Sequence, residues 1–253
     1  MKSVNVSLAC LPGMRFEPAI LRSLDGLHDP ELGELNTEHL QLCPQNFGVL
    51  TVDLAQDISR KYSSKLRLHA NVRVLPKMIF ADLSSFKENQ EWFLQAAKVS
   101  QALNAPAYTL HAGNRSEATL NEIFDYVKEV EDLFMCDVGI EGLYPTKGNK
   151  YLVSTWDEYS RLLSSGVKYA LDLSHLNILS SQTNVLEINL VKELLSSDKC
   201  IEIHLSSNDG VGDTHQKLDN QPWWFKLLGE VGQNAVLFSE GNQISNVKPR
   251  IVQ

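Results

Sequence analysis

Short apolar runs with strand character alternate with amphipathic segments along nearly the whole chain. Strands are expected at 4–10, 31–36, 65–72, 106–113, 137–142, 168–175, 200–207 and 235–241. Helices are expected at 17–24, 52–62, 85–103, 116–134, 155–165, 184–197 and 221–231, with Ser116 as the N-cap of the fourth. Eight strands that alternate with helices predict an α/β fold with a parallel sheet, most simply a closed (β/α)8 TIM barrel.

The length and the connecting segments favour one domain. No proline- or serine-rich linker divides the 253 residues, so we expect a single TIM-barrel domain over 1–253. An open doubly wound sheet is the alternative, although no G-x-G-x-x-G follows the first strand. After the eighth strand only "NQISNVKPRIVQ" remains. Because this segment is short and contains Pro249, the eighth helix is expected to be short or missing.

Net charge, cysteine positions and the N-terminal segment indicate which partners and which compartment to expect. The formal net charge of −8 argues against general nucleic-acid binding through a basic surface. The four cysteines are scattered and form no C-x-x-C pair, which is typical of a reducing compartment. The N-terminal apolar run is broken by Pro12 and Gly13 and is too short for a signal peptide or a membrane span. We therefore expect a cytoplasmic protein with no membrane partner.

Ionisable side chains gather at the carboxyl ends of the expected strands, where TIM barrels carry their chemistry. These positions are His69, His111, Glu141, Asp172, His175, His204 and Glu240, and the loop after the seventh strand adds Asp213 and His215. Carboxylates brought together in a dry barrel mouth would repel one another, and divalent cations relieve that repulsion. Imidazole and carboxylate ligands suit Zn²⁺, Mn²⁺ or Fe²⁺.

A structural role is the alternative for each of these residues. A lone histidine at a strand end is more often a satisfied structural residue than a ligand. Five histidines and four carboxylates at six strand ends are better explained by a shared metal site. The sequence therefore predicts metal binding rather than a purely structural network.

The strand-end segments also resemble a known group of proteins. "YTLHAG", "VGIEG", "LDLSH", "IHLSSNDGVGDTH" and "LFSEGN" are similar to the motifs of the xylose isomerase-like TIM barrels. The nearest pattern is that of endonuclease IV, the family-2 apurinic/apyrimidinic endonucleases, and the resemblance runs from about residue 66 to 242.

The resemblance implies a centre of three metal ions and hydrolysis of a phosphate ester. His69, His111 and Glu141 would hold one ion, and Glu141 would bridge to a second. The second ion would also be held by Asp172, His204 and Glu240, and the third by His175, Asp213 and His215. Two to three zinc ions are implied, with manganese or iron as alternatives.

The substrate implied by the resemblance is a phosphate ester. Glu141 would orient the nucleophile, and Arg73 in the loop after the third strand is a candidate for phosphate binding. The loop after the second strand is acidic to neutral, unlike the basic loops with which endonuclease IV reads DNA. The expected partner is therefore either a phosphorylated or sugar-containing small substrate or damaged DNA.

Other functions stay open at this point. Sugar isomerases and epimerases of the same superfamily use one metal ion, which Glu141, Asp172, His204 and Glu240 would hold here. In that case one of the catalytic pair Glu141 and Glu240 would exchange a proton with a carbon beside a carbonyl. Multinuclear iron oxidases form a second enzymatic alternative, and a barrel that only binds a ligand is the non-enzymatic one.

Overall fold

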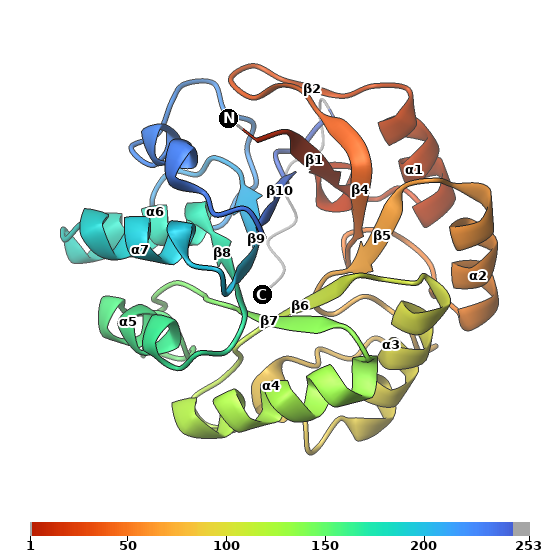
Figure 1. Ribbon diagram of the computed structural model, residues 1–253, viewed down its shortest axis with the longest axis horizontal. Coiled ribbons are helices and arrows are strands. Elements are labelled where there is room, and N and C mark those ends of the chain that lie inside the picture. Colours follow the sequence, from red (N-terminus) through yellow and green to blue (C-terminus); the bar gives the residue numbers. More distant parts are fainter. Residues whose placement is uncertain (1, 245–253) are drawn as a thin grey trace.

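The computed structural model describes residues 2–244, and in them eight parallel strands close into a barrel (Figure 1). In chain order the barrel strands are β1 (Val4–Ser7), β4 (Asn36–Leu42), β5 (Lys65–Leu68), β6 (Ala107–His111), β7 (Asp137–Glu141), β8 (Tyr169–Asp172), β9 (Cys200–Leu205) and β10 (Val236–Ser239). The barrel closes because β1 pairs with β10 on one side and with β4 on the other. The (β/α)8 prediction is therefore confirmed.

Helices surround the strands and cover the outside of the barrel (Figure 1). They are α1 (Phe16–Leu24), α2 (Val52–Lys61), α3 (Gln90–Ala102), α4 (Leu120–Phe134), α5 (Trp156–Ser164), α6 (Leu173–Thr183) and α7 (Ile188–Ser196), with 3₁₀ helices η1 (Leu8–Cys10), η2 (Leu83–Ser85) and η3 (Phe225–Glu230). No helix among residues 2–244 is both long and apolar enough to cross a membrane.

The strands are buried on both faces, as expected of a parallel sheet that is covered by helices. All six residues of β9 are buried, and so are all four of β8 and of β1. Polar residues occur within these buried strands, including Glu202 and His204 of β9 and Asp172 of β8. Because burying such groups without partners costs free energy, the interior of the barrel must supply their partners.

The second strand lies further along the chain than predicted. The structure places it at Asn36–Leu42, whereas the expected range 31–36 falls mostly in a hairpin of β2 (His28–Asp29) and β3 (Gly33–Glu34). Polar residues inside "NTEHLQL" hide its strand character from a hydrophobicity pattern. His39 is satisfied by Arg67 and Gln41 by Glu202, and only the closed barrel provides these contacts.

Four helix predictions were wrong in their bounds or type. The helix expected at 85–103 begins only at Gln90. Helix α4 begins at Leu120, and its N-cap is Thr119 rather than Ser116. The expected helix 221–231 is the 3₁₀ segment η3. The expected helix 184–197 begins only at Ile188.

One helix was not expected from the sequence. Helix α6 follows β8 directly because Asp172 ends the strand and accepts hydrogen bonds from the backbone N–H groups of Ser174 and His175. The expectation of a short or missing eighth helix concerns the chain after residue 241, and residues 245–253 lie outside the described residues.

Candidate metal centre

All nine predicted ligand residues lie at the carboxyl end of the barrel. His111, Glu141 and Asp172 are the last residues of β6, β7 and β8. The others follow the same geometry: His69 directly after β5, His175 in the first turn of α6, His204 near the end of β9, Asp213 and His215 in the following loop, and Glu240 directly after β10. Parallel strands end at the same rim, so six separate segments deliver their polar groups to one place.

Glu141 lies at the centre of the group. Its Oε2 is 3.4 Å from His69 Nε2 and 4.0 Å from His111 Nε2. Its Oε1 is 3.4 Å from His204 Nδ1 and 3.8 Å from His175 Nδ1. One carboxylate therefore faces four imidazoles that come from four different strand ends.

The other four residues, Asp172, Asp213, His215 and Glu240, are connected to Glu141 through His175 and through one another. His175 Nε2 is 3.5 Å from Asp172 Oδ2 and 3.4 Å from Asp213 Oδ2. His215 Nε2 is 2.8 Å from Asp213 Oδ2 and 3.7 Å from Glu240 Oε2. All nine side chains thus form one connected network of four carboxylates and five imidazoles.

The side chains fall into a buried floor and a more open rim. Those of Glu141, Asp172, His175 and His204 are at most 4% exposed. Those of His111, Asp213 and His215 are 26%, 18% and 21% exposed. A molecule that approaches the barrel mouth would therefore meet the rim residues first.

Two atoms in the middle of the network lack hydrogen-bond partners. Glu141 Oε2 and His204 Nδ1 are both buried and unpaired within the described part of the chain. Buried polar atoms without partners are uncommon and costly, unless an ion or water satisfies them. Both atoms face the other donors of the cluster and can ligate a divalent cation once the His204 ring has lost its proton at Nδ1.

Three subsets are compact enough to hold an ion, with ligand atoms within 4.8 Å of one another. They are His69–Glu141–His204, Glu141–Asp172–His175 and Asp172–His204–Glu240. The last subset lies within the set that the resemblance implies for the second ion, whereas the first groups His69 with His204 rather than with His111. The division of the nine residues among individual ions stays a prediction.

Burial and mutual charge shift the protonation of the cluster. Burial lowers the pKa of His69 to about 3, in spite of the neighbouring Glu141. Burial alone would also lower the pKa of His204, but the charges of Glu240 and Glu141 raise it well above its usual value. Burial raises the pKa of Glu240 and outweighs the effect of His204. Such opposed shifts among neighbouring groups are typical of functional sites.

Most of the imidazoles are also held from outside the cluster. His111 Nδ1 lies 3.2 Å from Asp82 Oδ1, and the backbone oxygen of Gly142 lies 2.9 Å from His175 Nδ1. Asp82 precedes η2 in the long loop after β5 and also accepts a hydrogen bond from Asn71. Asp82 was not predicted from the sequence, because a carboxylate in a loop carries no strand-end signal.

A buried ion pair lies deeper in the barrel. Arg67 Nη1 of β5 donates to Glu202 Oε2 of β9 over 2.7 Å, and both side chains are at most 3% exposed. Burial alone would raise the pKa of Glu202, but Arg67 and His204 lower it to about 2. Arg67 also contacts His39 Nδ1 at 3.2 Å. This pair fills the barrel interior beneath the nine side chains.

Arg73 does not contact the cluster through any hydrogen bond or ion pair found among the described residues. Its guanidinium donates to the backbone oxygens of Leu75 and Pro76 in its own loop. A role in substrate binding stays a prediction for this residue.

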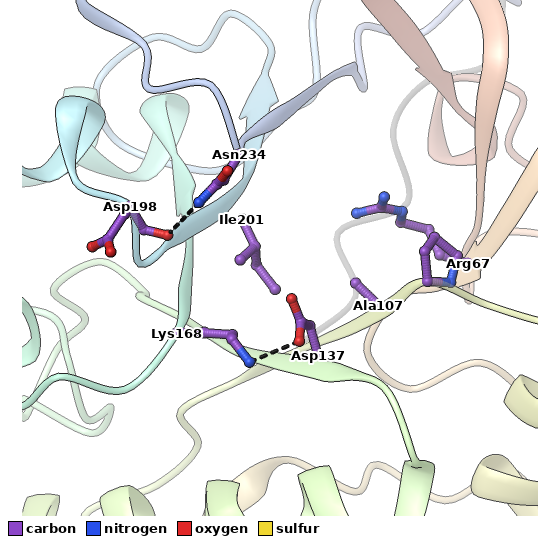
Figure 2. A pocket seen from close by; sticks show the side chains of 8 residues that line it. Arg67, Ala107, Asp137, Lys168, Asp198, Ile201 and Asn234 are labelled. Atoms are coloured by element: carbon purple, nitrogen blue, oxygen red, sulfur yellow. Dashed lines mark hydrogen bonds and ion pairs between the residues drawn. The ribbon is translucent and has the colours of Figure 1, made fainter.

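A cavity of about 270 Å³ lies at the opposite, amino-terminal end of the barrel (Figure 2). Its polar lining is paired internally: Lys168 contacts Asp137 at 2.7 Å, and Asn234 donates to the backbone oxygen of Asp198. Arg67 borders the cavity and points its guanidinium into the barrel. The two cationic side chains of its lining, Lys168 and Arg67, are thus already paired, with Asp137 and with Glu202.

The architecture is shared with solved structures, although no protein-family model and no curated protein matches the sequence. The D-tagatose 3-epimerase-like protein aligns with a TM-score of 0.68 at 14% identity, over 96% of this chain and 92% of that one. Family-2 AP endonuclease from Brucella melitensis gives 0.63 at 12% identity, over 96% and 93%. A xylose isomerase domain protein from Alicyclobacillus acidocaldarius gives 0.58 at 10% identity, over 97% and 91%.

The chain therefore has the fold of the xylose isomerase-like TIM barrels, which confirms the resemblance seen in the sequence. Structures named for epimerase, isomerase and endonuclease functions share this fold with it.

Proposed function

We propose that this barrel is a metal-dependent hydrolase of phosphate esters whose metal centre holds two to three ions. The observation that carries the proposal is the size of the connected donor set. Four carboxylates and five imidazoles exceed what one ion can use, and zinc suits this mixture of ligands. When bound, such ions polarise water and a phosphoryl oxygen and stabilise the leaving oxygen.

The chain's own residues would divide this work between floor and rim. Glu141 is central and buried, so it is suited to orienting an attacking water. Asp213, His215 and His111 lie toward the open rim, where a phosphate ester would enter. The net charge of −8 favours a small phosphorylated substrate over a DNA duplex, which needs a basic surface.

A single-metal sugar isomerase or epimerase is the second candidate. It is favoured by the compactness of the subset Asp172–His204–Glu240, next to which Glu141 lies. In this case Glu141 and Glu240 would flank the sugar and move a proton between adjacent carbons. His111, Asp213 and His215 would then have no metal to bind.

Two variants separate these candidates. His111→Ala and Asp213→Ala each remove a rim donor that only the multinuclear centre needs. We expect both variants to lose hydrolysis of p-nitrophenyl phosphate or bis-p-nitrophenyl phosphate by at least about 100-fold, as loss of a catalytic metal implies. The wild-type protein should carry two to three equivalents of transition metal by elemental analysis.

The opposite results would identify the second candidate. One metal equivalent, ketose epimerisation by the wild type, and full activity in both rim variants would exclude the hydrolase. Folded wild-type protein that takes up no metal would exclude both candidates.

A further inference from the structure

One buried carboxylate beneath the cluster accepts four hydrogen bonds. Glu202 Oε2 accepts from Arg67. Glu202 Oε1 accepts from Gln41, from Thr109 Oγ1 at 2.7 Å and from His204 Nε2 at 2.8 Å. Glu202 is not one of the nine predicted ligands, and its side chain is completely buried.

These contacts determine which nitrogen of His204 carries a proton. A carboxylate paired with arginine is ionised and can only accept hydrogen bonds. The contact to Glu202 therefore requires a proton on Nε2 of His204. The Gln41 amide lies 3.0 Å from the same nitrogen, but it donates its hydrogen to Glu202. In the neutral imidazole this leaves Nδ1 as the free lone pair, and Nδ1 is the atom that faces Glu141 and Glu240.

The same carboxylate reaches His69 through one hydroxyl group. The proton of Thr109 Oγ1 is directed to Glu202, so the lone pairs of this oxygen are free to accept. His69 Nδ1 lies 3.3 Å from Thr109 Oγ1 and donates to it. The proton on Nδ1 leaves Nε2 of His69 free, and Nε2 is the atom that faces Glu141.

We propose that Glu202 and Thr109 are positioning residues that fix the tautomer and orientation of His204 and His69 toward the metal centre. Metal-bound histidines commonly donate their other N–H to a fixed acceptor, and losing that acceptor weakens metal binding. Here a single ion-paired glutamate serves two histidines from different strands, whose rings lie 4.9 Å apart. The inference rests on the proposed function, because it requires that these histidines bind metal.

Arg67 keeps the carboxylate ionised from the side away from the metal centre. Its guanidinium donates to Glu202, and Arg67 also borders the cavity at the amino-terminal end (Figure 2). It also packs over the ring of Phe238, with the guanidinium carbon 5.3 Å from the ring centroid. Packing against Phe238 holds Arg67 in place, and Arg67 in turn holds Glu202 in a defined position next to both histidines.

The test compares metal affinities by competition with a chelator, together with the visible absorption spectrum of the Co²⁺-loaded protein. Glu202→Gln puts an amide in place of the ionised acceptor, and Thr109→Val removes the hydroxyl at constant shape. We expect each to weaken metal binding by about 10–100-fold and to alter the Co²⁺ spectrum. Thr109→Ser, which restores the hydroxyl, should recover the affinity.

Glu158→Gln is the matched control. Glu158 is also buried and also paired with an arginine, Arg115, but it contacts none of the nine predicted ligands. This control should keep the wild-type affinity and spectrum. If Glu202→Gln does not fold, the comparison of Thr109→Val with Thr109→Ser decides alone.

The possible failures are distinguishable. Wild-type protein that binds no metal would refute the proposed function. Wild-type protein that binds metal, with Thr109→Val and any folded Glu202→Gln as tight as Glu158→Gln, would overturn the positioning role alone. Equal losses in Thr109→Val and Thr109→Ser would also overturn it, because the hydroxyl would then be irrelevant.

Discussion

At the scale of single residues, the site depends on imidazole rings in which each of the two nitrogens contacts a different partner. His175 shows this best: Nδ1 contacts the backbone oxygen of Gly142, while Nε2 faces Asp172 and Asp213. Gly142 has a further constraint, because a Cβ on it would overlap the ring of Tyr159. The position of one backbone oxygen in the site therefore depends on the absence of a side chain.

Replacing this glycine should disturb both stability and the site. We expect Gly142→Ala to lower the free energy of unfolding by about 1–3 kcal/mol, the usual cost of overpacking. The substitution should also weaken metal binding, because the carbonyl that holds His175 would shift. Denaturant unfolding and chelator competition measure the two effects. Gly229→Ala is the control, since nothing lies within 4 Å of its Cβ position, and an equal loss in both variants would refute this explanation.

At the scale of elements, hydrophobic periodicity located most helices and strands but not all their ends. Helix α4 illustrates the difference. Its apolar stripe is evident in the sequence, but both Ser116 and Thr119 could cap it. The structure selects Thr119, whose side chain accepts from the backbone of Glu122 while the Glu122 carboxylate accepts from the backbone of Thr119. This reciprocal capping box satisfies two backbone donors at once.

The cap gives a direct prediction. Thr119→Ala should lower the free energy of unfolding by about 0.5–2 kcal/mol, because a helix N-terminus loses its acceptor. Ser116→Ala should change it little, since Ser116 is exposed and lies outside the helix. Thermal unfolding of the two variants measures this. A larger loss for Ser116→Ala would mean that the cap lies where the sequence first suggested.

At the scale of the whole molecule, closure of the barrel creates the cluster. Residues from His69 to Glu240 meet only because β10 returns to β1 and completes the ring. The molecule thereby concentrates buried charge at one end. Its stability should therefore depend on pH and on metal more than the stability of an ordinary α/β core does.

The charged histidines set the direction of this dependence in metal-free protein. Burial alone would lower the pKa of His175 and of His215, but neighbouring carboxylates, chiefly Asp172 and Asp213, raise both to about 10. Because both values lie above the usual 6.5, their stabilising effect is complete below about pH 6.5 and declines as the pH rises toward 10.

We therefore expect the melting temperature of chelator-treated protein to fall between about pH 7 and about pH 8, below the pKa of about 8.5 at which cysteine thiols of the unfolded chain ionise. Saturating Zn²⁺ should raise the melting temperature and reverse the trend, because ligation requires deprotonated ligands. Scanning calorimetry with and without metal measures both. A metal-free profile that is flat over this range would contradict the charge state assigned to His175 and His215.

Residue order alone was enough to predict the alternation of strands and helices and the presence of ionisable residues at strand ends. These are local properties: periodicity follows from backbone geometry, and a polar residue after an apolar run is visible without coordinates. Tertiary structure alone decided the second strand at Asn36–Leu42, the role of Asp82, and the layer formed by Arg67, Glu202 and Thr109. Each of these depends on contacts between segments far apart in the chain. Burying their polar groups would cost free energy without partners, and only the closed barrel supplies those partners.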